Sequence, residues 1–433
     1  MNAVSAHNLS KNQSEVSFVK AMKCRECGSE YPKQPIHVCE FCFGPLEIAY
    51  DYEAIAKSLT RKAIENRMNS MWRYAELLPL DGPPSVGAQT GMTPLVKADR
   101  LAKWLGVKEL WLKNDSVSYP TLSFKDRVVS VAISKAREFG IKVVACASTG
   151  NLANATASQA ASVGMPAVIL IPHDLEPAKV LATSVYGARV VGVNGTYDDV
   201  NRLCSEIAGK YGWGFVNVNL RPFYAEGSKA FGYEIAEQLG WKVPAHVVVP
   251  MAGGSLITKI DKAFKEFTKL GFVESRATKI HGAQAAGCGP IASMVVEERD
   301  YVKPVKTPQT IAKSLAIGNP ADAIYARQSM LGSGGFAALP NDDDICEAIL
   351  ALAENEGIFT ETAGGVTLGA AKKLVQQGRI GSNDGPVVLS ITGQGLKTQD
   401  PLVDRVRKPS LIGPKLGDFD QLVGSGAFTG YVS

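Results

Sequence analysis

The chain has 433 residues, of which 45% are hydrophobic and 20% are charged, and this is typical of a folded protein with room for two or three domains. Its formal charge of +4 comes from 46 basic and 42 acidic residues mixed along the chain, so charge gives no reason to expect a nucleic-acid or membrane partner. The apolar runs are far too short to span a bilayer and no apolar signal region opens the chain. We therefore expect a cytoplasmic protein, or a plastid protein if a transit peptide has been removed.

Two closely spaced pairs of cysteines come first along the chain. Cys24 and Cys27 form one C-x-x-C hook, and Cys39 and Cys42 form a second. Two hooks joined by a hairpin place four thiolates around one zinc ion, so residues 21–48 are predicted to be a zinc-ribbon-like segment with these four ligands. Disulfides are one alternative, which a reducing cytosol disfavours. A ribbon that packs as an appendage without metal is another.

The segment from Tyr119 to Arg127 isolates one lysine between a turn and a helix. A Pro-Thr pair is typical of the turn, and the apolar pattern that follows predicts a helix beginning near Asp126. Lys125 would then lie at the positive end of the helix dipole. The dipole and any burial disfavour the ammonium form and release an amine that can attack aldehydes. An ordinary surface lysine beside a turn is the alternative interpretation.

From about residue 140 onward, short apolar runs alternate with helix-like stretches, which is the pattern of βαβ units. Strands are predicted at 143–147, 167–171, 188–193, 214–217, 246–250, 279–283 and 386–391. Helices are predicted at 151–161, 176–186, 197–211, 256–270, 342–356 and 366–377. The predicted class is α/β, with two open sheets covered by helices and a cleft between the two domains.

Three loops at predicted strand ends are candidates for one binding site. The run Ser148-Thr-Gly-Asn151 opens an alanine-rich helix, so its hydroxyl and backbone N–H groups form an anion-binding corner. The glycines of the run 251–256 allow the backbone to approach a phosphate closely. The run 392–397 follows the last strand. Together with an activated lysine, these loops indicate a phosphate-bearing aldehyde.

The ordered combination of these motifs resembles the threonine synthases, a group within the fold type II family of pyridoxal-phosphate (PLP) enzymes. The resemblance covers roughly residues 20–405. It runs through Ser123-Phe-Lys-Asp-Arg127, Ala147-Ser-Thr-Gly-Asn151, Gly253-Gly-Ser255, Ser314-Leu-Ala-Ile-Gly-Asn-Pro320 and Thr392-Gly-Gln-Gly-Leu-Lys397.

The resemblance implies a tryptophan synthase β-like architecture of two doubly wound open-sheet domains. Residues 49–126 and 227–405 would form the large PLP-binding domain, and residues 127–226 the small α/β domain. Residues 1–20 would be a disordered N-terminus and residues 406–433 a C-terminal tail.

The resemblance also assigns the cofactor contacts. Lys125 would hold PLP as a Schiff base and act as the catalytic base, and Asn151 would hydrogen-bond the phenolic oxygen of PLP. The loop from Gly253 to Leu256 would hold its phosphate, and Thr392 would face its pyridine nitrogen. A neutral hydroxyl stabilises a protonated pyridinium less than a carboxylate does, which favours elimination and replacement over transamination.

The implied reaction converts O-phosphohomoserine and water to L-threonine and phosphate. The freed lysine would remove protons from Cα and then Cβ, phosphate would leave Cγ, and water would add at Cβ. Ser148 and Thr149 would bind the substrate carboxylate. Arg221, with Asn219 and Lys229 behind it, is the candidate for the substrate phosphate, and a surface salt bridge is the equal alternative for Arg221.

The chain departs from the usual family pattern at three positions. Leu122 ends a run that is more often Asn-Pro-Thr-Gly, and Leu152 stands where many relatives have a threonine that contacts the substrate phosphate. Tyr224 lies near the expected position of a phosphate-binding arginine, so Arg221 is expected to replace that arginine from a shifted position.

Two rival functions remain. One is another PLP enzyme of the same fold, such as a threonine or serine dehydratase or a β-replacement enzyme; the run 314–320 and the cysteine hooks favour the synthase. The other is a binding module or a catalytically silent homologue, against which the intact Lys125, Asn151 and Thr392 argue. A homodimer is usual for the relatives and is expected here.

Overall fold

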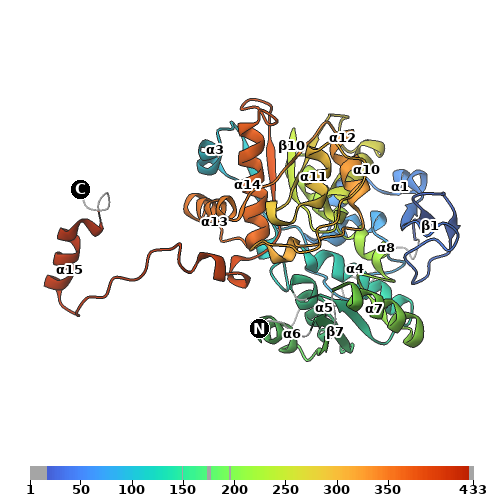
Figure 1. Cartoon of the computed structure of the whole chain (residues 1–433). Helices are drawn as coiled ribbons and strands as arrows, with labels where there is room; N and C mark the ends of the chain where they lie inside the picture. Colours follow the sequence, from blue (N-terminus) through green and yellow to red (C-terminus); the bar gives the residue numbers. More distant parts are fainter. Residues whose placement is uncertain (1–16, 149, 173–176, 195–196, 429–433) are drawn as a thin grey trace. The chain divides into compact units, whose positions relative to one another are not determined.

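The structure is a computed structural model that describes residues 17–148, 150–172, 177–194 and 197–428 (Figure 1). Residues 1–398 form one compact unit and residues 399–433 form a second. Most of the N-terminal stretch expected to be disordered lies outside the described residues, but strand β1 begins within it, at Val19.

The first sheet belongs to the cysteine-containing segment. Its strands are β1 (Val19–Cys24), β2 (Glu30–Tyr31) and β3 (Leu46–Tyr50), which pair antiparallel in the order β2-β1-β3. Alternate residues of β3 are buried, as expected for a strand with one face on the core. We call residues 19–50 the ribbon.

The second sheet has six strands in the order β12-β11-β10-β13-β5-β4. Its members are β4 (Leu95–Lys97), β5 (Leu110–Asn114), β10 (His246–Pro250), β11 (Lys279–Ala283), β12 (Ala337–Ala338) and β13 (Val387–Ile391). All neighbours run parallel except β4, which pairs antiparallel with β5 at the edge. The strands predicted at 246–250 and 279–283 are confirmed, and the last one begins one residue later than predicted.

The third sheet has four parallel strands in the order β8-β7-β6-β9. They are β6 (Val144–Ala147), β7 (Ala167–Pro172), β8 (Arg189–Val193) and β9 (Gly214–Phe215). The last strand is shorter than predicted because the chain turns after Phe215, whose carbonyl accepts hydrogen bonds from the backbone N–H groups of Val218 and Leu220. The α/β class with two open, mainly parallel sheets is confirmed.

Helices pack against both parallel sheets. The α-helices of the first unit are α1 (Tyr52–Ser58), α2 (Arg61–Glu65), α3 (Asp99–Leu105), α4 (Lys125–Glu138), α5 (Asn151–Ala161), α6 (Pro177–Ser184), α7 (Tyr197–Tyr211), α8 (Arg221–Glu226), α9 (Lys229–Gln238), α10 (Ser255–Lys269), α11 (Pro290–Val296), α12 (Ala323–Gly332), α13 (Asp342–Glu356) and α14 (Thr362–Gln376). The short 3-10 segments are η2 (Met71–Leu77), η3 (Asp115–Val117), η4 (Ala286–Cys288), η5 (Lys313–Leu315) and η6 (Gly395–Lys397). Helices α5, α7 and α13 have the predicted bounds, and α14 begins four residues earlier than predicted.

The second unit contains η7 (Asp400–Leu402), α15 (Leu416–Leu422) and the π-helical η8 (Val423–Ala427). It includes the described part of the predicted C-terminal tail, so that segment carries helical structure. Within the described part of the chain, no helix is both long enough and apolar enough to cross a membrane.

Candidate active site

The predicted site loops meet where parallel strands end. Strands β5, β13 and β10 are neighbours in the large sheet, so their carboxyl ends lie at one edge. The chain after β5 leads to Lys125, the chain after β13 begins with Thr392, and the chain after β10 contains Gly253 and Gly254. Ligands of open α/β sheets bind at such an edge. The bonds described below bring Asn151, which follows β6 of the smaller sheet, to the same place.

The residue after Lys125 fixes the turn that precedes it. The carboxylate of Asp126 accepts hydrogen bonds from the backbone N–H of Thr121 at 3.0 Å, from the hydroxyl of Thr121 at 2.6 Å and from the backbone N–H of Ser123 at 3.3 Å. Burial raises the pKa of Asp126 to about 6, although these hydrogen bonds favour the carboxylate. Lys125 is the first residue of α4, as its sequence context predicted.

Arg127 anchors the other side of Lys125 in the core. Its guanidinium is fully buried and forms bidentate ion pairs with Asp115 (Nε to Oδ2, 2.7 Å) and Glu234 (Nη2 to Oε2, 2.8 Å). Lys113 adds a third buried ion pair, 2.6 Å from Glu234. A buried cation needs such partners, because an unpaired charge in the core is costly. Lys125 is therefore held between two anchored neighbours, with its own side chain partly exposed.

Asn151 and Thr392 are joined by a carboxylate that the sequence analysis did not identify. Glu361 accepts a hydrogen bond of 2.7 Å from Nδ2 of Asn151 and one of 3.3 Å from the hydroxyl of Thr392. Lys397 donates to Oδ1 of Asn151 at 2.9 Å and also bonds the backbone carbonyl of Thr121. The amide of Asn151 is thus fixed in orientation, and Nδ2 retains a second hydrogen for a ligand.

Glu361 is 3% exposed, and this burial raises the pKa of its carboxyl group. The hydrogen bond from Asn151 and the charge of Lys397 act in the opposite direction but do not cancel the effect of burial. Burial likewise lowers the pKa of Lys397. Gly393 permits this arrangement, since a Cβ atom there would lie 2.5 Å from the carboxylate of Glu361. The available sequence signal was an acidic residue directly before a glycine-rich helix, which is too common to indicate a site.

The residues present fit PLP. Gly254 has a φ of 95° and caps α10, whose first N–H groups lack intrahelical acceptors and favour an anion. A Cβ atom at Gly253 would meet no atom within 4 Å, so there is open space beside this helix start, where Ser255 and Leu256 form the first turn. The hydroxyl of Ser123, two residues before Lys125, is buried without a hydrogen-bond partner in the described part of the chain. An amine, an anion cradle and a fixed amide are the groups a phosphate-bearing aldehyde requires.

The residues predicted to bind substrate lie in different surroundings. Ser148 is partly exposed next to the start of α5, and Thr149 lies outside the described residues. Both ends of the Asn219 amide bond the backbone, at Phe215 N (2.8 Å) and Trp213 O (3.0 Å), so this side chain shapes the turn after β9. These bonds favour a structural role for Asn219.

Arg221 forms an ion pair of 2.7 Å with Asp322, whose backbone N–H donates to the carbonyl of Gly253. The Arg221 side chain retains 27% exposure, and Arg221 lines a small recess together with His37 and Ser255. Asp322 therefore links Arg221 to the glycine loop, because it contacts both.

Lys229 is fully buried in a charge network that ties the ribbon to helices α8, α9 and α10. Its Nζ is 2.7 Å from Glu226 and 3.1 Å from Glu266, so its geometry supports a structural role and not a substrate contact. Lys259 of α10 bridges Glu226 (2.6 Å) and the ribbon residue Glu47 (3.1 Å).

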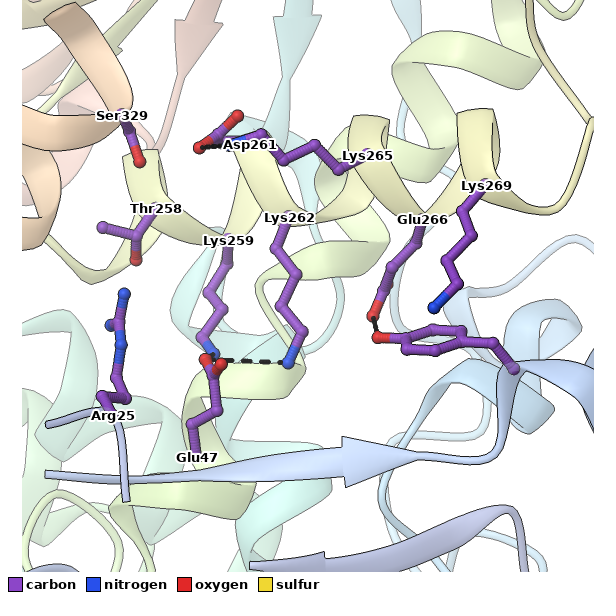
Figure 2. A pocket seen from close by; sticks show the side chains of 11 residues that line it. Arg25, Glu47, Thr258, Lys259, Asp261, Lys262, Lys265, Glu266, Lys269 and Ser329 are labelled. Atoms are coloured by element: carbon purple, nitrogen blue, oxygen red, sulfur yellow. Dashed lines mark hydrogen bonds and ion pairs between the residues drawn. The ribbon is translucent and has the colours of Figure 1, made fainter. Parts of the chain in front are cut away.

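Figure 2 shows Lys259 and Lys262 reaching from α10 to Glu47 beside a cavity of about 250 Å³. Burial raises the pKa of Glu47, but the charges of the two lysines outweigh this effect and lower the pKa to about 2. The charged groups of this cavity are thus largely engaged with one another.

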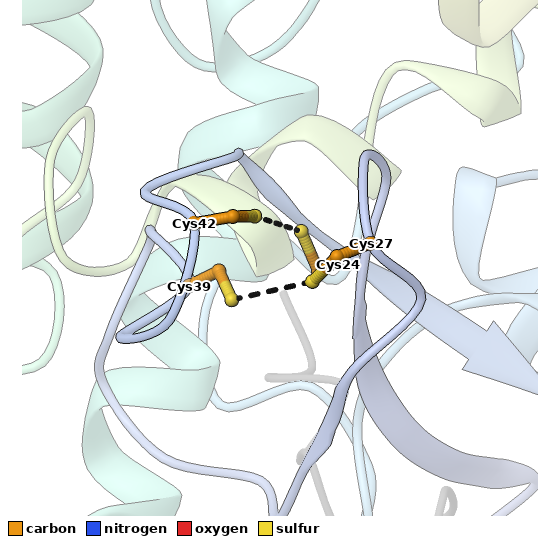
Figure 3. Close-up of side chains that lie close together, drawn as sticks. All are labelled: Cys24, Cys27, Cys39 and Cys42. Atoms are coloured by element: carbon orange, nitrogen blue, oxygen red, sulfur yellow. Dashed lines mark hydrogen bonds between the residues drawn. The ribbon is translucent and has the colours of Figure 1, made fainter.

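The four ribbon cysteines form one cluster (Figure 3). Their sulfur atoms all lie within 4.8 Å of one another, with Cys24 and Cys42 3.4 Å apart and Cys27 and Cys39 3.7 Å apart. Tetrahedral zinc with Zn–S bonds of about 2.3 Å requires sulfur separations of about 3.8 Å. The donor set and spacing therefore fit a zinc ion.

Comparisons with known proteins show the family to which the chain belongs. A model of the pyridoxal-phosphate dependent enzyme family matches residues 86–393. The threonine synthase of Methanosarcina acetivorans is 38% identical over 393 residues, which are 90% of this chain and 95% of that protein. The chain belongs to the threonine synthase family. A second threonine synthase, from Methanocaldococcus jannaschii, is 38% identical over 390 residues, or 89% of this chain and 95% of that protein.

Solved structures show the same fold. Diaminopropionate ammonia lyase from Escherichia coli has a TM-score of 0.61 at 19% identity and covers 73% of this chain and 89% of its own. Threonine deaminase isoform 2 from Solanum lycopersicum has a TM-score of 0.59 at 24% identity, with 70% and 84% coverage. A model of the NinF protein family matches residues 23–47, within the ribbon of this threonine synthase family member.

Proposed function

We propose that this member of the threonine synthase family converts O-phosphohomoserine and water to L-threonine and phosphate, with PLP bound at Lys125. The observation that carries the proposal is the meeting of Lys125, Asn151 and Thr392 at the sheet edge that also holds the glycine loop before α10. PLP, when bound, withdraws electrons from the α-carbon of an amino-acid substrate.

The residues around it have separate tasks in this proposal. The amine of Lys125 takes the proton from Cα and then from Cβ of the substrate, and phosphate leaves from Cγ. The hydroxyl of water adds at Cβ, Cγ gains a proton to become the methyl group of threonine, and a proton returns to Cα. The remaining amide hydrogen of Asn151 binds the cofactor's phenolic oxygen, and the first turn of α10 from Ser255 binds the cofactor's phosphate.

Substrate binding is proposed at two places. Ser148 and Thr149, at the start of α5, bind the substrate carboxylate. Arg221 binds the substrate phosphate as a planar, bidentate donor, and its ion pair with Asp322 holds the guanidinium near the glycine loop.

The ribbon is proposed to hold one structural zinc ion through Cys24, Cys27, Cys39 and Cys42, on the support of their spacing. We further propose a cytoplasmic homodimer without nucleic-acid or membrane partners. The domain limits proposed are 49–126 with 227–405 for the large domain and 127–226 for the small one. The four-stranded sheet lies within residues 127–226, and the six-stranded sheet lies within residues 49–126 and 227–405.

The deciding experiment incubates purified, PLP-loaded protein with O-phosphohomoserine and follows inorganic phosphate and threonine together. Equal release of both is expected, and Lys125→Ala is expected to abolish both products and the absorbance of bound PLP. Bound PLP with no phosphate release would reject the synthase function in favour of a dehydratase or replacement enzyme, which threonine, serine and O-acetylserine would then distinguish.

A further inference from the structure

The amine of Lys125 has a specific neighbour that the proposed function does not yet use. Nζ of Lys125 lies 3.1 Å from the phenolic oxygen of Tyr224, which is within hydrogen-bonding distance. Tyr224 is only 8% exposed, and the amine also lies 5.6 Å from the ring centre of Phe124. A phenol in such a place is a partner for the amine and not a surface group.

The contact depends on a close approach of two helices. Tyr224 is on α8, which packs against α4. Gly227, just after α8, makes this possible, because a Cβ atom there would lie 2.9 Å from the backbone carbonyl oxygen of Arg127 and from Cα of Val128. An alanine at this position would therefore force the two helices apart.

Helix α8 is also anchored at both ends. Its first residue, Arg221, pairs with Asp322 at 2.7 Å. Its last residue, Glu226, is fully buried and pairs with Lys229 at 2.7 Å and Lys259 at 2.6 Å. The position of Tyr224 is thus set by ion pairs at both ends of α8, so the phenol is preorganised beside the amine.

The chemistry of the proposed reaction calls for a group of this kind. One amine must remove two carbon-bound protons in succession, so it must lose the first before it can accept the second. A phenol and an alkylammonium ion release their protons at nearly the same pH in water, about 10. A proton can therefore pass between them at small cost, which suits a proton-transfer partner.

We propose that Tyr224 acts through Lys125, as the partner that takes up and returns a proton of its amine. In each cycle the phenol of Tyr224 first releases its proton to solvent. The ammonium group of Lys125 then gives its extra proton to the phenolate, the neutral amine accepts the next proton from carbon, and the phenol later returns its proton. No electron is transferred and no covalent bond to Tyr224 forms. The proposal rests on the proposed function of Lys125 and adds a second group to its proton transfers.

The test compares Tyr224→Phe with the wild type in two separate measurements. The first is kcat together with the rate at which the α-proton of L-threonine exchanges with deuterated solvent, followed by NMR. Both are expected to fall about 100-fold, the scale of a lost acid–base group, with KM changed less than about threefold. The second is the rate at which apoenzyme captures PLP, followed by absorbance. Capture is expected to persist, because the ring still packs and the lysine stays in place.

Two further variants make the result decisive. Tyr224→Gln keeps a hydrogen-bonding side chain that is neither an acid nor a base near neutral pH, so this variant is expected to be as slow as Tyr224→Phe. Recovery of wild-type rates would overturn the proton transfer. Tyr52→Phe removes a partly buried phenol, 2.6 Å from Glu266, and is expected to keep wild-type kcat. Unchanged proton exchange in Tyr224→Phe, or loss of PLP capture along with activity, would refute the proposal. Failure of the proposed function itself would instead appear as a wild-type enzyme that releases no phosphate.

Discussion

Glu361 holds Asn151 by one end of its amide, through a hydrogen bond of 2.7 Å to Nδ2. Lys397 holds the other end at 2.9 Å. The family resemblance assigned Asn151 to the cofactor, but the side chain is oriented by two residues that are more than 200 positions away in the sequence. Orientation by such supporting residues determines how well a ligand contact works.

Glu361→Ala is therefore expected to weaken PLP binding. It leaves Asn151 without the acceptor that fixes its orientation and removes the partner of Thr392. A lost buried hydrogen bond costs about 1–3 kcal/mol, so we expect the Kd of PLP to rise about 10- to 100-fold. Fluorescence titration of the apoenzyme with PLP measures this. Glu347→Gln, which alters an exposed carboxylate on α13, is the control and is expected to bind PLP normally. Equal affinities for all three proteins would show that Glu361 does not support the site.

A second prediction concerns the buried network around Glu226. Glu226→Gln leaves Lys229 and Lys259 with one fewer buried counter-charge, and breaking such a pair costs about 3–5 kcal/mol. We expect the free energy of unfolding, measured by urea denaturation, to fall by roughly that amount. Lys265→Ala, which removes a largely exposed lysine that pairs with Asp261, is expected to change the free energy of unfolding by less than about 1 kcal/mol. A Glu226→Gln protein as stable as Lys265→Ala would mean that the network contributes little.

A third prediction concerns pH and two stacked histidines. The backbone N–H of Phe336 donates to Nδ1 of His281, so the proton of His281 is on Nε2 and points to Nδ1 of His246, 2.9 Å away. His246 in turn bonds Asp384 at 3.0 Å through Nε2. Burial, aided by neighbouring positive charges, lowers the pKa of His281 to about 3.

The folded protein therefore keeps His281 neutral at a pH where the unfolded chain, with a histidine pKa near 6.5, takes up a proton. The stability that this site contributes is complete above pH 6.5 and is lost progressively as the pH falls from 6.5 toward 3. Below pH 6 the loss should approach about 1.4 kcal/mol per pH unit in wild type relative to His281→Gln. Denaturation curves at pH 7, 6 and 5 measure it, and groups such as Asp126 cancel in the comparison. Parallel pH profiles for the two proteins would contradict the assigned neutral state.

A fourth prediction concerns the metal. Purified protein is expected to contain about one zinc ion per chain by elemental analysis, in keeping with a four-thiolate structural site. Cys24→Ser is expected to lose the metal and to unfold at a lower temperature, since metal binding contributes folding free energy. Cys288→Ser changes a buried cysteine outside the ribbon and is expected to retain zinc. A wild-type protein that is free of zinc after purification without chelators would favour the metal-free ribbon.

Local sequence patterns predicted much of the fold because many elements carry their own signals. Helix α5 has the predicted bounds, and its alanine-rich sequence follows a Gly that ends the preceding loop. Strand β5 was missed, since its end contains Lys113 and Asn114, which do not suggest a buried strand. Lys113 is buried there because Glu234, from a distant helix, supplies its counter-charge. No local pattern contains that information.

In the candidate site, too, local motifs could be predicted but contacts between distant residues could not. Lys125 and the glycine loop were predicted from short motifs at strand ends. Glu361 lies 210 positions from the asparagine it contacts, and Tyr224 lies 99 positions from Lys125. Such pairings arise from the packing of helices and strands, so the residue types could be read from the sequence but their partners could not. Lys229 shows the same limit, because its sequence context does not reveal the two carboxylates that enclose it.

The ion pairs between Glu47 and the lysines of α10 bear on how this protein is assembled as a set of modules. A cysteine ribbon at the start of a chain looks like a part that evolution can add, remove or exchange freely. Here the ribbon supplies a counter-charge to two lysines of α10, which otherwise share only Glu226 as an ion-pair partner among the described residues. Exchange of the ribbon for one without an acidic residue at this position would therefore change the charge balance beneath it.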